Sequence, residues 1–112
     1  MLLKAYSVFD GTAQAFAQPF YMANDGMAIR AFAGTVNDQK DGNTIAAHPE
    51  QFTLFQIGTF DDKTGVIEKL ETPRSIGLGV EFVENDRKIY RDADMDLVLK
   101  EIDKLKNLLM EK

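Results

Sequence analysis

Apolar positions are densest over residues 52–71, where two strand-like runs flank a polar loop. The first run carries bulky apolar side chains on both parities, namely Phe52, Leu54 and Phe60 on one and Phe55 and Ile57 on the other. This pattern is typical of a central strand that is covered on both faces. Residues 61–65, Asp-Asp-Lys-Thr-Gly, suit a turn that ends in a glycine at positive φ, and residues 66–71 again resemble a strand. The pattern predicts a β-hairpin.

A shorter alternation precedes this hairpin at the start of the chain. Residues 2–9 alternate between two sides and end at Asp10-Gly11, so they predict a first strand. Residues 12–20 contain Pro19 and have no clean period. We expect them to form an extended connector that runs against the core.

The helical period first appears after residue 24. Asn24 suits a helix cap and Asp25 an acidic first turn. An apolar stripe follows at helical spacing: Ile29, Phe32, Ala33 and Val36. We therefore predict a helix over residues 25–37 that crosses from the first strand to the hairpin. The polar loop 37–43 and His48-Pro49-Glu50 separate this helix from the hairpin.

The segment after the hairpin is less regular. Thr72-Pro73-Arg74 interrupts the strand pattern, and residues 76–83 resume it as a fourth predicted strand. Because Gly77 and Gly79 leave one side of this strand nearly bare, either a neighbour packs closely there or the strand is a flexible edge. Residues 84–93 read as a short linker.

A second helix is predicted over residues 94–110. Acidic residues precede it and lysines lie towards its end, which complements the helix dipole. Its apolar seam consists of Val98, Ile102, Leu105 and Leu109. This seam is too short for a free coiled coil, so we expect it to pack on the sheet or to form the interface of a homodimer.

These elements predict one α+β domain over residues 1–112. Its order is β, α, β, β, (β), α, with two helices packed on a small antiparallel sheet of three to four strands. Hydrophobic residues make up 45% of the 112, enough for a core of this size. Neither a signal peptide nor an apolar run long enough to span a membrane is present, so we expect a soluble protein without membrane contact.

Charge and cysteine content exclude several kinds of binding site. The absence of cysteine excludes disulfides and thiolate metal sites, which fits a reducing cytoplasm. A formal net charge of −5 opposes non-specific binding to phosphate backbones across the whole surface.

Catalytic and metal-binding patterns are weak throughout. The spacing of Asp92, Asp94, Asp96 and Asp103 is that of an EF-hand, but Leu97 occupies the glycine position. Asp61-Asp62 fits a turn better than a pair of catalytic carboxylates, and His48, the one histidine, has no partnered nucleophile. Gly77-x-Gly79 lacks the third glycine of a dinucleotide site. We expect no enzyme activity, no metal and no cofactor.

Basic residues with interleaved aromatics provide a candidate site for single-stranded DNA. A cationic groove with stackable rings is what such a site requires. The candidate residues are Arg74, Arg87, Lys88, Tyr90 and Arg91. The alternative is an ordinary solvated surface, because acidic neighbours surround these cations.

Several stretches, in this order and spacing, together carry a family resemblance. They are Tyr6-Ser-Val-Phe-Asp10, Gln18-Pro-Phe20, Ala28-Ile-Arg-Ala-Phe32, Val36-Asn-Asp38, His48-Pro-Glu-Gln-Phe-Thr-Leu-Phe55, Ile57-Gly-Thr-Phe-Asp-Asp62 and Ser75-Ile-Gly-Leu-Gly79. Over about residues 2–83 the chain resembles the small nonstructural protein of gokushoviruses, which are Microviridae with circular single-stranded DNA genomes. The last 30 residues carry no motif of that family.

The resemblance implies a non-capsid viral protein in the bacterial host cytoplasm. Such a protein is expected to bind DNA or the replication and packaging machinery, and to regulate the switch from genome replication to packaging. No catalytic motif comes with the resemblance. The recurring positions, most of which look structural, are Pro19, Ala28, Arg30, Phe32, His48, Pro49 and Phe60. The alternative function is an adaptor for a viral or host protein without DNA affinity, which the net charge favours.

Overall fold

The computed structural model describes residues 1–84. The elements, in chain order, are β1 (Leu2–Asp10), β2 (Ala15–Phe16), β3 (Phe20–Met22), α1 (Asp25–Asn37), α2 (Thr44–Ala47), the 3-10 helix η1 (Pro49–Gln51), β4 (Phe52–Asp61), β5 (Ile67–Leu78) and the 3-10 helix η2 (Gly79–Phe82). The strands form one antiparallel sheet, and the predicted α+β class is confirmed. The predicted helix 94–110 and most of the predicted linker 84–93 lie outside the described residues.

Strand β1 pairs with more strands than any other strand of the described sheet. It pairs with β4 along one edge and with both β2 and β3 along the other, while β5 pairs with the far side of β4. The β4–β5 hairpin is confirmed: Asp61 N donates to the Val66 carbonyl at 2.9 Å, and Gly65 adopts a φ of 76°. Only glycine adopts such a φ without strain, which explains why the loop ends there.

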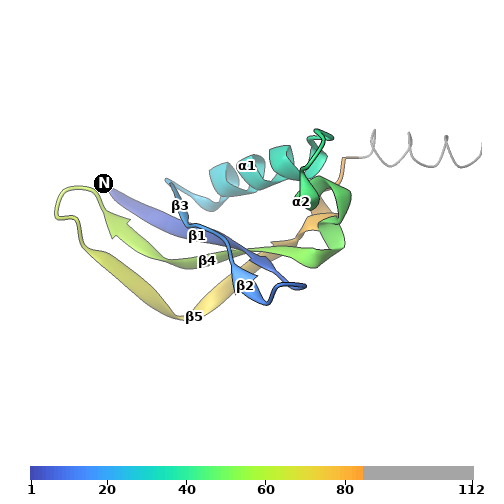
Figure 1. Cartoon of the computed structure of the whole chain (residues 1–112). Helices are drawn as coiled ribbons and strands as arrows, with labels where there is room; N and C mark the ends of the chain where they lie inside the picture. The colour runs from blue at the N-terminus through green and yellow to red at the C-terminus, as the bar shows by residue number, and fades with distance from the viewer. Residues whose placement is uncertain (85–112) are drawn as a thin grey trace, which may run out of the picture.

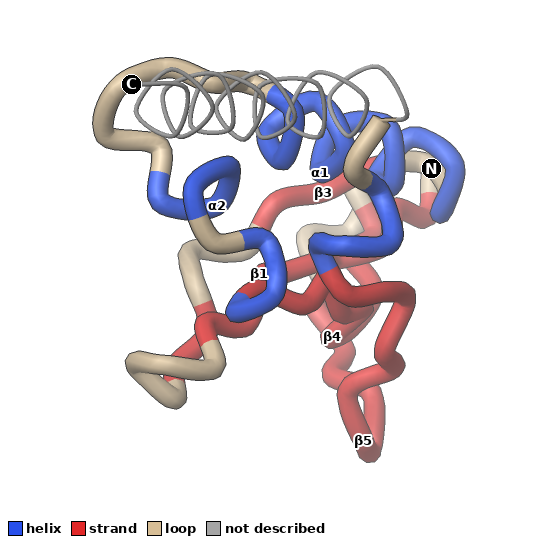
Figure 2. The backbone as a smooth tube through the Cα atoms, turned by 90° about the vertical axis from the view of Figure 1, so that its right-hand side faces the viewer, coloured by secondary structure: helices blue, strands red, loops and turns tan. Residues whose placement is uncertain are grey.

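Within residues 1–84, the helices lie on one face of this sheet. Figure 1 shows α1 and α2 on the same side of the strands, and the view turned by 90° in Figure 2 shows the same two layers. The burial of β4 alternates accordingly, with Phe52, Leu54 and Gln56 buried and the residues between them half-buried. No helix of residues 1–84 lies on the second face, and because the predicted helix 94–110 is outside the described residues, coverage of both faces stays a prediction.

The core lies between α1 and the covered face. Asn24 caps α1 as predicted, because its Oδ1 accepts a hydrogen bond from Met27 N at 2.9 Å. The buried cluster consists of Tyr6, Ala28, Phe32, Val36, Phe52 and Leu54. The stripe of α1 is thus centred on Ala28, Phe32 and Val36, whereas Ile29 is only partly buried. The short helix α2, capped by Asn43, was not predicted.

The predicted connector 12–20 contains strand β2 and runs into strand β3 at Phe20. Phe9 pairs with Phe16, and Tyr6 pairs with Phe20, so the segment folds back along β1. Asp10 starts the reversal by accepting hydrogen bonds from the backbone N–H groups of Thr12 and Ala13. Pro19 lies between the two strands, where its missing N–H interrupts no ladder. Tertiary pairing thus overrides the lack of a sequence period.

The predicted break at Thr72-Pro73-Arg74 and the separate strand 76–83 were both wrong. Strand β5 is continuous, because it is an edge strand that accommodates Pro73 in a bulge. Arg74 pairs with Gln56 and Lys69 with Gly58, so residues 70–73 all lie opposite a single residue of β4. Residues 79–82 form η2 instead of a strand.

The two glycines near the end of β5 are explained by close packing. A Cβ on Gly77 would lie 2.6 Å from the Phe82 ring, and one on Gly79 would lie 2.3 Å from the Pro49 carbonyl oxygen. The bare side of this segment therefore receives η1 and η2 and is not a flexible edge. The Phe82 ring also contacts Phe32 of α1, with ring centroids 5.6 Å apart.

Candidate nucleic-acid interface

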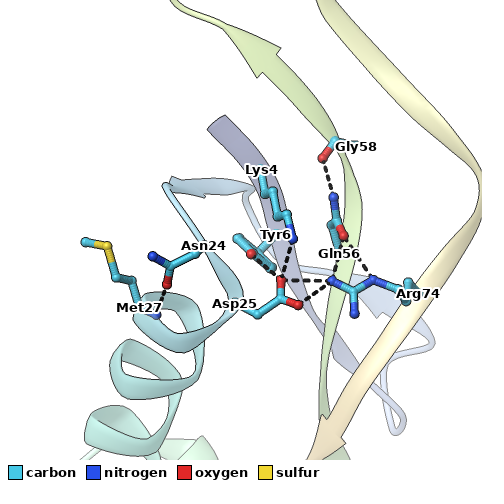
Figure 3. Close-up of polar contacts among 8 residues, drawn as sticks. All are labelled: Lys4, Tyr6, Asn24, Asp25, Met27, Gln56, Gly58 and Arg74. Carbon is cyan, nitrogen blue, oxygen red and sulfur yellow. Dashed lines mark hydrogen bonds and ion pairs between the residues drawn. The ribbon is translucent and has the colours of Figure 1, made fainter. Parts of the chain in front are cut away.

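Asp25, the first residue of α1, joins the helix to the sheet. Its carboxylate accepts a hydrogen bond from Tyr6 Oη at 2.6 Å and from Arg74 Nη2 at 2.8 Å to each oxygen (Figure 3). Lys4 Nζ lies 3.4 Å away. Lys4 and Tyr6 come from β1 and Arg74 from β5, so a single carboxylate connects the start of α1 to two strands that are not adjacent.

Gln56 completes this cluster from β4, which lies between β1 and β5. Its buried side chain accepts hydrogen bonds from Arg74 Nε at 3.0 Å and Nη2 at 2.7 Å, and its amide donates to the Gly58 carbonyl at 3.2 Å. A buried amide is costly unless it is hydrogen-bonded, and here both of its ends are satisfied. Arg74 is therefore held from two sides.

Asp25 and Tyr6 both have shifted pKa values in this cluster. The hydrogen bonds from Tyr6 and then Arg74 lower the pKa of Asp25 to about 2. Burial, followed by the hydrogen bond to Asp25, raises the pKa of Tyr6 far above its usual range. A general acid or base should titrate near the working pH, which neither group does. The cluster therefore acts as a fixed connection between the helix and the sheet. It is here named the clasp and consists of Lys4, Tyr6, Asp25, Gln56 and Arg74.

The structure places one predicted DNA-contacting residue within this clasp. The Arg74 side chain is 46% exposed, but it lies on the helix-covered side and its guanidinium already binds a carboxylate and an amide. The other predicted DNA-binding residues lie outside residues 1–84: Arg87, Lys88, Tyr90 and Arg91. The predicted interface residues Val98, Ile102, Leu105 and Leu109 lie outside them too.

The remaining candidate side chains have local roles. Asp61 accepts a hydrogen bond from Lys63 N at 2.9 Å within the hairpin turn, and Asp62 pairs with the N-terminal amine. His48 is exposed and lies 3.6 Å from Glu50. Within residues 1–84, no group of three or more His, Asp or Glu side chains could hold a metal ion. In the same range, no helix is long and apolar enough to cross a membrane.

The face of the sheet opposite the helices, here named the open face, follows from the strand register. Residues paired across strands point to the same side, and the side chains of Tyr6 and Leu54 mark the helix side. The paired positions of the open face are Leu3, Ala5, Ser7, Phe9, Phe16, Tyr21, Thr53, Phe55, Gly58, Phe60, Ile67, Lys69, Ser75 and Leu78. Five of the ten aromatic residues within 1–84 therefore lie on the side that no described helix covers, and the other five belong to the core or pack against it.

Two separate ring clusters lie on the open face. Cluster one joins β1, β2 and β4: the Phe9 and Phe16 centroids are 4.9 Å apart, and those of Phe16 and Phe55 are 5.5 Å apart. Cluster two joins β3 and β4, with the Tyr21 and Phe60 centroids 5.3 Å apart. Phe16 is 46% exposed and Tyr21 is 41% exposed. Each cluster thus offers one ring edge or face to solvent.

Charge is distributed unevenly over the described residues. Residues 1–84 contain six Lys and Arg against eleven Asp and Glu, so this part carries the whole formal net charge of −5. At the paired positions of the open face, however, the one charged residue is Lys69, a cation. Acidic repulsion therefore comes mainly from the helices, the loops and the covered side.

Sequence reasoning missed the open face as a site. The signal was the apolar content of both parities in residues 52–60, together with Leu3 and Phe9 on one parity of the first strand. That signal was interpreted as a second covered face. Nothing in the sequence placed Phe16 and Tyr21 beside these residues, because their strands lie in a segment without a period.

Comparison with known protein families identifies a relationship for most of the described residues. The family model described as Phage ORF5 protein matches residues 3–82, from the start of β1 to the end of η2. Neither the curated proteins nor the solved structures contain a match to the chain. The matched region includes the clasp and both ring clusters.

Proposed function

Because the chain belongs to the Phage ORF5 protein family, we propose that this phage protein is a non-enzymatic, nonstructural protein that binds single-stranded DNA. The sequence resemblance to gokushoviruses supports an origin in the Microviridae and action in the bacterial host cytoplasm. There it would regulate the switch from genome replication to packaging, acting on the single strand or on the packaging machinery. A homodimer stays a prediction of the sequence.

The aromatic open face is the observation that carries this proposal. Rings on an uncovered antiparallel sheet can stack on bases, and each stacked base contributes about 1–3 kcal/mol in single-strand binding proteins. Phe16 and Tyr21 are the most exposed of these rings. Duplex DNA does not fit such a face, since the faces of its bases are covered by their neighbours.

The charge pattern supports local rather than general affinity. Lys69 supplies a cation on the open face, and no carboxylate occupies a paired position there. The acidic groups elsewhere repel phosphates, but salt screens this repulsion beyond a Debye length of about 8–10 Å at physiological ionic strength. Binding should therefore depend on the rings more than on the net charge.

The test is fluorescence anisotropy with a labelled single-stranded oligonucleotide. Phe16→Ala should weaken binding by roughly 5- to 150-fold, corresponding to the loss of one stacked base. Met27→Ala is the matched control, because Met27 is 48% exposed on α1 and lies away from the open face. The affinity of this variant for the oligonucleotide should equal that of the wild type. Absence of binding by the wild-type chain up to high micromolar concentration rejects the proposal.

An adaptor for a viral or host protein is the second candidate. The excess of eleven acidic over six basic side chains in residues 1–84 favours it, as does an exposed apolar surface, which often marks a protein interface. Such an adaptor would show no DNA binding at low salt. It would retain a protein from infected cells on an immobilised wild-type chain, and the Phe16→Ala chain would not retain it.

A further inference from the structure

We infer that the two ring clusters of the open face are separate base-stacking subsites for one extended single strand of DNA. The inference rests on the proposed function and specifies how it is performed. It assigns the binding surface to Phe9, Phe16 and Phe55 in cluster one and to Tyr21 and Phe60 in cluster two.

The positions of the clusters along β1 set the distance between them. Cluster one lies beside Ser7 and Phe9, because these residues pair with Phe55 and Phe16. Cluster two lies beside Leu3 and Ala5, because these pair with Phe60 and Tyr21. The centres are thus about four strand residues apart, and at about 3.3 Å per residue this corresponds to roughly 13 Å.

This separation excludes two neighbouring stacked bases as occupants of the two clusters. Successive bases in stacked DNA are about 3.4 Å apart along the axis, so a rigid stack would need about four steps to reach from one cluster to the other. In such a stack each base is covered by its neighbours, so its face is not free to stack on a protein ring. An extended, unstacked strand has no such conflict, and it can present one base to each cluster.

Between the two clusters, β1 offers no further side chain to a base. Ala5 and Ser7 are buried, and the Ser7 hydroxyl donates a hydrogen bond to the Ala17 carbonyl at 2.6 Å. Lys69, exposed on the neighbouring β5, pairs with Gly58, which in turn pairs with Ala5. The register therefore places Lys69 on the same face as cluster two, and on this inference its ammonium contacts a phosphate of the bound strand.

The experiment is isothermal titration of the full chain with unlabelled oligothymidylates of two, three, four, six and eight nucleotides. A dinucleotide reaches one cluster, whereas a hexanucleotide reaches both. We expect the affinity to increase more than tenfold between these two lengths. Beyond six nucleotides it should rise only slowly, because no further ring is gained.

Variants at the two exposed rings test whether both clusters cause this step. Phe16→Ala and Tyr21→Ala should each remove it, so that the variant binds the hexanucleotide no more tightly than the wild type binds the dinucleotide. Tyr21→Phe should keep the step, since the ring remains, whereas Tyr21→Leu should lose it although its side chain is still apolar. Met27→Ala serves as the control, and circular dichroism confirms that each variant is folded.

The outcomes separate this inference from the proposed function. A step that disappears in both ring variants supports the two subsites. An affinity that rises evenly with length, or a step that survives in either alanine variant, overturns the two subsites while DNA binding itself stands. Failure of the wild-type chain to bind any length overturns the proposed function and the inference together.

Discussion

Asp25 is the single residue on which the attachment of α1 to the sheet most depends. Its hydrogen bonds to Tyr6 and Arg74 are charge-assisted, and such bonds contribute about 1.5–3 kcal/mol each before solvent screening. Because a third of the Asp25 side chain is exposed, we expect Asp25→Asn to lower the free energy of unfolding by about 1–2 kcal/mol at pH 7. Urea denaturation measures it. Asp41→Asn, in the exposed loop before α2, should change it by less than about 0.5 kcal/mol.

The same carboxylate predicts a dependence on pH. The pKa of Asp25 is lowered from 3.8 to about 2 in the folded state, so its contribution is fully present above about pH 4 and is lost as the pH falls towards 2. The stability difference between wild type and Asp25→Asn should therefore shrink over this window. Urea titrations at pH 7, 4 and 2.5 measure it, and an unchanged difference at pH 2.5 would contradict the assigned role.

At the scale of elements, the pairing of β4 with β5 depends on a glycine. A Cβ on Gly58 would lie 2.4 Å from the Glu68 carbonyl oxygen, a backbone atom that cannot move without shifting β5. We expect Gly58→Ala to destabilise the fold by about 1–3 kcal/mol. A thermal melt measures this, and a melting temperature equal to that of the wild type would show that β5 is less closely held.

A glycine in helix α1 should respond in the opposite way, with a gain in stability on substitution by alanine. Gly34 lies in the interior of α1, and a Cβ there would meet no atom within 4 Å. Gly34→Ala should therefore stabilise the protein by about 0.5–1 kcal/mol, because alanine loses less backbone freedom in a helix. The same melt tests it, and destabilisation would indicate that α1 approaches a neighbour at that point.

At the scale of the whole molecule, salt dependence distinguishes the two possible DNA surfaces. Each phosphate contact to a single strand changes log K by about −0.7 per unit of log salt. One contact, from Lys69 on the open face, predicts a loss of about threefold in affinity between 50 and 200 mM salt. Three contacts, from Arg87, Lys88 and Arg91, predict a loss of about 20-fold. Anisotropy titrations at the two salt concentrations measure the slope.

A charge reversal provides the complementary measurement. If the basic residues beyond the described part supply the phosphate contacts, the double change Arg87→Glu and Arg91→Glu should abolish binding. On the open-face mechanism the double variant retains most of its affinity, and Lys69→Ala flattens the salt slope instead. Unchanged affinity in the double variant would remove Arg87 and Arg91 from the interface.

The sequence by itself determined the elements with strong local signals. The first strand, the capped helix 25–37 and the hairpin closed by Gly65 were all confirmed, because alternation, capping and a turn at positive φ are set by neighbouring residues. The α+β class followed from their order. Asp25 was correctly placed in the first turn of the helix, but as a charge beside the helix dipole and not as a clasp.

Only the tertiary structure decided which residues meet. Strands β2 and β3 form by pairing with β1, and β5 stays continuous through Pro73 because residues 70–73 form a bulge opposite a single residue of β4. Arg74 looked like a free cation until the fold brought it to Asp25, 49 residues away. The open face likewise depends on register and on which side the helices pack. Local propensity fixes neither, because both are set by contacts between residues far apart in the chain.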